Sequence, residues 1–124
     1  MCRTIQNRKQ LIRIRDRQAA RQGWTCYYCK QPMWRTDPRA FAERHGLTLP
    51  QAKLLQVTAE HLVPRCEGGA DSDANVAAAC RFCNLKRHQA KTALSPAAYA
   101  RKVRRQLQAG RWHGLRLQPS PPPH

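Results

Sequence analysis

The apolar positions of this chain predict mainly short helices, with one β-like stretch near the middle. Residues 5–22 are rich in helix formers, and Gly23 follows them at a position where helices commonly end. The apolar residues of this segment form only a weak stripe, and basic residues lie between them. We therefore expect residues 1–23 to form a basic N-terminal helix.

Two short helices are expected in the stretch that follows. The Asp37 side chain can cap a helix, Pro38 suits the first helical position, and Gly46 would end that helix. Residues 48–56 predict a second short helix. Together these helices are expected to form an insertion, about residues 37–56, between the two halves of a metal-binding unit.

From Val57 the pattern changes to that of a β-strand, VTAEHLV. Pro64 limits this strand, and Gly68 with Gly69 indicates a turn, so that a hairpin should follow. A helix over about residues 82–91 is expected after the second strand.

Residues 92–110 predict a basic C-terminal helix. Ser95 and Pro96 suit its first positions, apolar residues recur every fourth residue from Tyr99, and basic residues occupy the other faces. Residues 111–124 end in a Pro-rich tail, which we expect to be disordered or extended.

The length and the charge narrow the choice of protein class. With 124 residues the chain forms one small domain, whose core needs additional support. No stretch reaches the roughly 18 apolar residues of a membrane span, so we expect no membrane partner. Basic residues interrupt the N-terminal segment where a secretory signal would be apolar, which predicts a cytoplasmic protein.

The formal net charge is +16, and it is unevenly distributed. Residues 1–23 hold 7 basic and 1 acidic residue, and residues 92–124 hold 6 basic residues and no acidic one. Residues 57–91 are nearly neutral, with 5 basic and 4 acidic residues. This layout favours a central unit held against a polyanion by its flanks, and the alternative is a solvated basic surface.

Four of the six cysteines form two C-x-x-C pairs, Cys26/Cys29 and Cys80/Cys83. In a reducing compartment this spacing predicts a closed structural zinc site that stabilises the fold and takes no part in catalysis. Aromatic residues surround the first pair, and they are better explained as core than as platforms for stacked bases: Trp24, Tyr27, Tyr28 and Trp34.

Polar residues suited to chemistry lie at the end of the first predicted strand, after the Gly-Gly turn, and directly after the second cysteine pair. They are Glu60, His61, Asn75, Asn84 and His88. A carboxylate with amide and imidazole groups suits Mg²⁺ or a similar divalent cation, and Asn84 and His88 would share one helix face. An unprotonated imidazole beside such a cation could take a proton from water.

The run AEHLVPRCEGGADSDANVAAACRFCNLKRHQAK, preceded by CYYC, resembles an HNH endonuclease of the ββα-metal family. The resemblance spans about residues 25–91. It implies an α+β fold with a small, treble-clef-like ββα-metal core, held by a structural zinc and flanked by basic helices. The nuclease domain would then occupy residues 24–91.

The resemblance also implies a role for each polar residue. His61 takes the place of the general base, and Glu60 that of the adjacent metal ligand. Asn75 takes the place of the central Asn, which fixes the loop and orients the base. Asn84 takes the place of a metal ligand, and His88 that of a second histidine on the same helix. The ions implied are structural Zn²⁺ and catalytic Mg²⁺ or another divalent cation.

Several basic residues are expected to contact the nucleic acid. They are Arg65, Lys86, Arg87, Arg101, Lys102, Arg104 and Arg105. Arg87 occupies a position where many family members have Lys, which would keep a phosphate contact. Cys66 stands where a small hydroxyl residue is common. Asp71 and Asp73 are most simply explained as turn residues.

One geometric difficulty concerns Glu60 and His61. Neighbours in a regular strand point to opposite faces, so both residues can serve one site only if the strand ends or bends there. Taken singly, the polar residues also fit structural roles, such as a surface ion pair, a core histidine or capping asparagines.

These observations predict a metal-dependent endonuclease that hydrolyses phosphodiester bonds in DNA, with His61 as general base. Duplex DNA is the expected partner, and RNA remains an alternative. A second hypothesis is a zinc-stabilised nucleic-acid-binding module without catalytic activity. A third is a toxin-like nuclease domain that a larger partner delivers.

Overall fold

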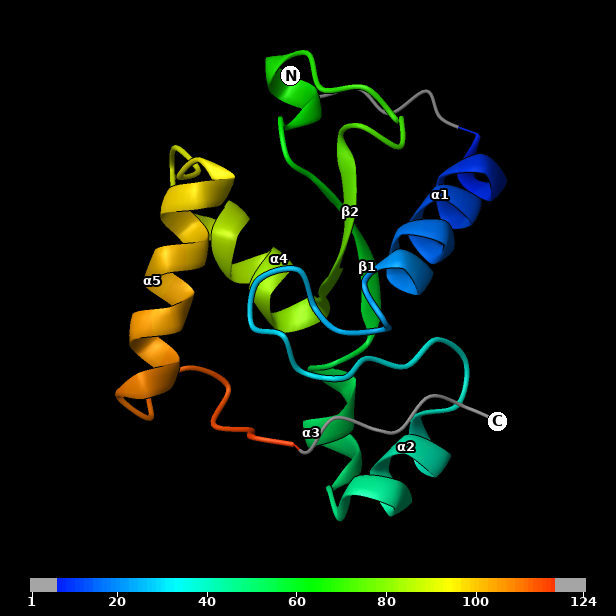
Figure 1. The fold of residues 1–124 in the computed structure, drawn as a ribbon, viewed down its shortest axis with the longest axis vertical. Coiled ribbons are helices and arrows are strands. Elements are labelled where there is room, and N and C mark those ends of the chain that lie inside the picture. Colours follow the sequence, from blue (N-terminus) through cyan, green and yellow to red (C-terminus); the bar gives the residue numbers. More distant parts are fainter. Residues whose placement is uncertain (1–6, 118–124) are drawn as a thin grey trace.

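A computed structural model describes residues 7–117 of the chain (Figure 1). At its centre, β1 (Val57–His61) and β2 (Val76–Cys80) form an antiparallel hairpin. The helix α4 (Arg81–Gln89) follows β2 directly and packs on both strands. The predicted hairpin and the helix after it are confirmed, and together they form a ββα unit within a small α+β fold.

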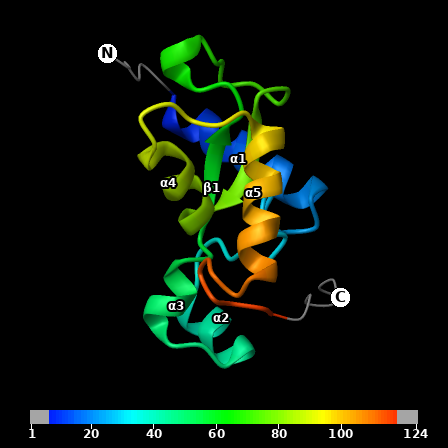
Figure 2. The same ribbon diagram turned by 90° about the vertical axis from the view of Figure 1, so that its left-hand side faces the viewer.

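The remaining helices surround this unit. α1 (Arg8–Arg21) lies on one side of the hairpin, and α4 with α5 (Pro96–Gln108) lies on the other (Figures 1 and 2). α2 (Pro38–His45) and α3 (Leu49–Lys53) pack against each other beyond one end of the hairpin (Figure 1). The hairpin is therefore covered on two sides by helices that carry basic residues.

The local signals in the sequence explain where these helices begin and end. Asp37 caps α2 by accepting a hydrogen bond from the Ala40 amide, and Gly46 ends the helix with φ of 66°. Thr48 and Gln51 form a capping box at the start of α3. Each of these short helices thus has a stop or start signal that the sequence predicts.

The core is small and lies between the hairpin and its helices. All five residues of β2 are buried, and α5 contributes Tyr99 and Val103 to the core. The Tyr28 and Tyr99 rings meet edge to face with their centroids 4.8 Å apart. The prediction that the aromatic residues near the first cysteine pair belong to the core is confirmed, because Trp24, Tyr27 and Trp34 pack against it and Tyr28 lies within it.

Two sequence expectations fall partly outside residues 7–117. The start of the predicted N-terminal helix and the Pro-rich end of the tail lie outside the described residues. Residues 111–117, predicted to belong to a disordered tail, instead pack on the core, where Leu115 is buried and Trp112 hydrogen-bonds to Cys83. Within the described range, no helix is both long enough and apolar enough to cross a lipid bilayer.

Candidate active site and metal centre

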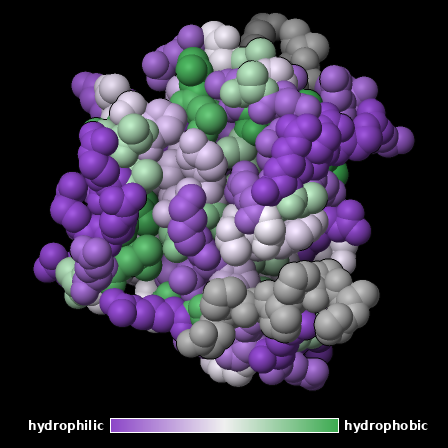
Figure 3. All heavy atoms as spheres, in the orientation of Figure 1, coloured by the Kyte–Doolittle hydropathy of each residue, from purple (hydrophilic) through white to green (hydrophobic). Residues whose placement is uncertain are grey.

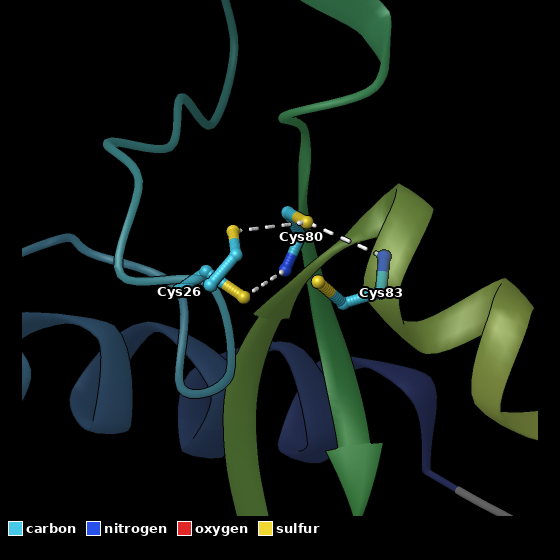
Figure 4. A group of neighbouring side chains, drawn as sticks. Cys26, Cys80 and Cys83 are labelled. Atoms are coloured by element: carbon cyan, nitrogen blue, oxygen red, sulfur yellow. Dashed lines mark hydrogen bonds between the residues drawn. The ribbon is translucent and has the colours of Figure 1, made fainter. Parts of the chain in front are cut away.

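Four cysteines converge where β2 meets α4. Cys26 and Cys29 lie on a turn before α2, Cys80 ends β2, and Cys83 lies in the first turn of α4. Their sulfur atoms all lie within 4.8 Å of one another, and all four residues are buried. Figure 4 shows Cys26, Cys80 and Cys83 with their side chains pointing toward one another.

N–H donors surround the sulfur atoms of this cluster. The amides of Tyr28 and Cys80 donate to Cys26 Sγ at 3.4 and 3.2 Å. The Cys83 amide donates to Cys80 Sγ at 3.4 Å, and the Trp112 indole donates to Cys83 Sγ at 3.3 Å. Such donors favour thiolate over thiol, which is the form that binds metal.

The cluster fits a zinc ion. Cys29 Sγ and Cys80 Sγ are 3.8 Å apart, and a tetrahedron with Zn–S bonds of about 2.3 Å has S–S edges of roughly 3.8 Å. Hydrogen bonds with Cys26 lower the pKa of the Cys29 thiol and raise the pKa of the Cys80 and Cys83 thiols. Because the pKa values of Cys80 and Cys83 are raised, these thiols become thiolates only beside a cation. The buried set of four cysteines is consistent with a structural zinc.

At the other end of the hairpin, the last residue of β1 carries the candidate base. His61 Nε2 lies 2.6 Å from Asp71 Oδ1, and the two side chains are 12% and 17% exposed. Arg65 also donates to the Asp71 carboxylate, at 3.2 Å. Burial alone would raise the pKa of Asp71, but the His61 hydrogen bond and the Arg65 charge outweigh it, and the pKa is lowered.

The structure gives two residues of this loop an additional contact. Asp71 lies in the turn, as predicted, but its carboxylate also joins the candidate site. Arg65, predicted to contact nucleic acid, binds Asp71 through Nε and Nη2, and its side chain is 19% exposed. The Gly68–Gly69 turn indicates that the loop returns toward the end of β1. No pattern in the sequence, however, indicates that Asp71 pairs with His61.

Asn75 closes the same loop. It accepts a hydrogen bond from the Val63 amide at 2.9 Å and donates to the carbonyls of Val63 and Ala70 at 3.0 Å. Gly69 makes this closure possible, because a Cβ atom there would lie 1.6 Å from the Val63 carbonyl oxygen. These contacts match the loop-fixing role predicted for Asn75. The short 3-10 helix η1 (Arg65–Glu67) lies within the loop.

Glu60 points to the opposite face of β1 and is 1% exposed. Its Oε2 accepts hydrogen bonds from Tyr28 at 2.9 Å and from Arg87 at 3.0 Å. Its Oε1 lies 2.8 Å from His88 Nε2. The strand stays regular through His61, which pairs with Val76 opposite, so the alternation of side chains separates Glu60 from His61. Within residues 7–117, no hydrogen bond or ion pair joins these two side chains.

The predicted phosphate contact of Arg87 is wrong. Its side chain is 2% exposed, and its guanidinium donates five hydrogen bonds inside the protein. These bonds reach Glu60 and the carbonyls of His61, Leu62 and Leu94. Arg87 therefore ties α4 to the end of β1 and has no N–H group left for a phosphate.

Asn84 and His88 lie on α4 beside Glu60. Asn84 Nδ2 donates to Thr58 Oγ1 at 3.0 Å and to the Ala59 carbonyl at 3.1 Å. Its Oδ1 accepts no hydrogen bond from the described residues, and the His88 side chain is 35% exposed. One carboxylate, one imidazole and one amide oxygen are a donor set that suits a divalent cation. In this structure, however, the Glu60 carboxylate is already neutralised by Arg87.

The exposed basic residues lie on the outer helices. Lys86 on α4 is exposed, and so are the four basic residues predicted on α5: Arg101, Lys102, Arg104 and Arg105. Figure 3 shows hydrophilic side chains over the outer sides of α1 and α5. α5 itself is anchored by Tyr99, whose hydroxyl donates to the Cys83 carbonyl at 2.6 Å.

Comparison with known proteins adds one match. Residues 48–90 match the family model described as HNH endonuclease, a range that contains α3, β1, η1, β2 and α4. The matched range therefore contains His61, Asn75 and the second cysteine pair. No curated protein and no solved structure shows a significant similarity to the chain.

Proposed function

We propose that this chain, whose residues 48–90 match the HNH endonuclease family model, is a metal-dependent endonuclease that hydrolyses phosphodiester bonds in DNA. The observation that best supports this function is the His61–Asp71 contact of 2.6 Å, at the end of β1, in a loop closed by Asn75. A histidine held by a carboxylate beside a fixed loop is the arrangement that general-base catalysis requires.

His61 is the proposed base. Because Nε2 is bound to Asp71 and Nδ1 makes no hydrogen bond to the described residues, Nδ1 is the atom that accepts a proton from water. The water oxygen forms a bond to phosphorus, and the bond between phosphorus and the 3′ oxygen breaks. The departing oxygen takes up a proton from solvent. A positioned base of this kind contributes about 10² to 10⁴ in rate.

The proposed cation ligands are Glu60, Asn84 and His88. A bound divalent cation would neutralise charge on the phosphate and on the leaving oxygen. This role requires the end of β1 to bend when substrate binds, because Glu60 and His61 lie on opposite faces of the regular strand. Glu60 Oε1 is the oxygen available to it, because Oε2 is held by Tyr28 and Arg87. His88 is the more exposed member of this group and can turn away from Glu60.

DNA is the proposed partner, held through its phosphates by exposed basic side chains. The four basic residues of α5 and Lys86 of α4 supply charge without reading sequence. Arg87 is not part of this surface, since its guanidinium is buried and fully engaged within the protein.

One observation favours a second candidate, a binding module without catalytic activity. The Glu60–Arg87 ion pair is buried, at 1% and 2% exposure, and removes the negative charge that would attract a cation. In that case the basic helices would still bind nucleic acid, but no divalent cation would support cleavage.

Supercoiled plasmid separates the two candidates. Wild-type protein with Mg²⁺ or Mn²⁺ should nick or linearise the plasmid, and excess EDTA added just before the substrate should stop the reaction. A parallel reaction with RNA tests the alternative substrate. Binding without cleavage under every divalent cation tried would support the binding module and overturn the endonuclease.

A further inference from the structure

We propose that Asp71 is a positioning residue for His61, which fixes the imidazole ring and places its proton on Nε2. This inference deepens the proposed function and rests on it. Asp71 lies ten residues from His61 along the chain, and its Oδ1 is 2.6 Å from His61 Nε2. Both side chains are more than four-fifths buried, which limits competition from water for this hydrogen bond.

The contact determines the tautomer of His61. An ionised carboxylate only accepts hydrogen bonds, so the proton that joins the two residues lies on Nε2. The other ring nitrogen, Nδ1, then carries the lone pair. During the reaction the proton of water moves to Nδ1, the Nε2 proton stays on the ring, and Asp71 remains ionised while it stabilises the imidazolium.

Asp71 is itself held from two directions. Arg65 donates to it through Nε and Nη2, each at 3.2 Å. The backbone on its N-terminal side is fixed by Asn75, which binds the Ala70 carbonyl at 3.0 Å. Since Gly69 permits the close approach to Val63, the loop can take this closed path, and the hydrogen bonds hold the Asp71 carboxylate beside His61.

This group is separate from the proposed cation ligands. His61 and Glu60 project from opposite faces of β1, and the hydrogen bonds of the Asp71 carboxylate to described side chains go to His61 and Arg65. A change at Asp71 should therefore lower the rate of the chemical step and leave the cation requirement and the substrate affinity almost unaffected.

The same loop offers a matched control, Asp73. It lies two residues further on, it is 40% exposed, and it pairs with Arg17 at 2.9 Å on α1. Asp71→Asn and Asp73→Asn remove one negative charge each from the loop, so the two variants have the same net charge. Only Asp71→Asn removes the carboxylate from His61.

The first readout is steady-state cleavage of a short duplex by purified, zinc-loaded protein. Asp71→Asn should lower kcat by about 10² or more, with KM changed less than about threefold. Asp73→Asn should keep kcat within about twofold of the wild type. Asp71→Glu, which retains a carboxylate, should recover part of the rate. An Asp71→Asn variant that cleaves as fast as Asp73→Asn would overturn the proposal.

The second readout needs no cleavage. Long-range ¹H–¹⁵N correlation spectra report which nitrogen of His61 carries the proton, and a His61→Ala spectrum assigns the signals. Wild type, Asp73→Asn and Asp71→Glu should show the Nε2–H form, and Asp71→Asn should lose it. If the wild type does not cleave, the endonuclease function fails but this spectrum still decides the role of Asp71. An unchanged tautomer in Asp71→Asn contradicts that role.

Discussion

The two ends of the β1–β2 hairpin are built in different ways. At one end Val57 pairs with Cys80, and four cysteine sulfurs gather within 4.8 Å in a buried cluster. At the other end His61 pairs with Val76, and partly exposed polar side chains are joined by hydrogen bonds. The first end suits a metal that holds the fold, and the second suits chemistry on a substrate.

The difference in energy between these ends is large. A structural zinc contributes roughly 10–16 kcal/mol of binding free energy, which becomes folding free energy in a small domain. A single hydrogen bond contributes only about 0.5–1.5 kcal/mol. We therefore expect the cysteine end to decide whether the chain folds, and the His61 end to tolerate substitution while the fold persists.

The largest effect is expected at the cysteine end. Cys80→Ser removes one of the four buried thiols, so the purified protein should lose its zinc and its cooperative unfolding transition. Zinc content by mass spectrometry and thermal unfolding by circular dichroism measure this. Cys66→Ser is the control and should keep about one zinc per chain, because Cys66 does not belong to the cluster. Loss of zinc in the control alone would identify a different ligand set.

The next effect concerns the buried ion pair between the two ends. Glu60→Gln leaves the Arg87 guanidinium without its counter-charge, and removal of one partner of a buried pair costs about 3–5 kcal/mol. Urea denaturation should show this loss in the free energy of unfolding. Glu67→Gln, at an exposed position on η1, should change it by less than about 0.5 kcal/mol. Equal stability of the two variants would mean that Glu60 does not pair with Arg87.

Substitutions on α5 separate binding from folding. Changing its four exposed basic residues to Gln, at Arg101, Lys102, Arg104 and Arg105, should weaken DNA binding. The slope of log affinity against log salt should flatten by up to about 3.6, the value for four phosphate contacts. Removal of the whole helix would be a poorer test, because Tyr99 and Val103 belong to the core.

The control for α5 keeps the charge, with Lys replacing Arg at positions 101, 104 and 105. Its salt slope should equal that of the wild type. A Gln variant with an unchanged slope would show that α5 does not face the DNA.

A smaller effect is expected at Asn84. If its amide oxygen holds the cation, Asn84→Ala should raise the Mg²⁺ or Mn²⁺ concentration for half-maximal cleavage by about tenfold. Added metal should then restore part of the rate. No such rescue is expected for a variant at His61, which is separated from Glu60 by the alternation of β1. A metal requirement that stays unchanged in Asn84→Ala would remove Asn84 from the ligand set.

The sequence was most informative where the signal is local. The C-x-x-C spacing predicts the cysteine cluster because one tight turn, or one helical turn, brings each pair together. The helix boundaries at Asp37, Gly46 and Ser95 likewise depend only on neighbouring residues. These features depend on residues close in sequence and not on how distant segments pack.

The sequence was least informative where distant segments meet. Whether Arg87 faces solvent or Glu60 depends on how α4 packs on β1, and the sequence reading placed it on the surface. The pairing of Asp71 with His61 depends on the path of a whole loop. The sequence predicts Glu60 and His61 in one site if the strand ends or bends there, but the strand pairs regularly through His61 and places the two side chains on opposite faces.

The central claim is that zinc at one end holds the fold while His61 at the other end performs the reaction. His61→Ala tests it most directly, with zinc content, DNA affinity and plasmid cleavage measured on one preparation. We predict about one zinc per chain and DNA affinity within about threefold of the wild type. Cleavage should be slower by about 10² to 10⁴. A His61→Ala protein that cleaves plasmid as fast as an active wild type would contradict the claim.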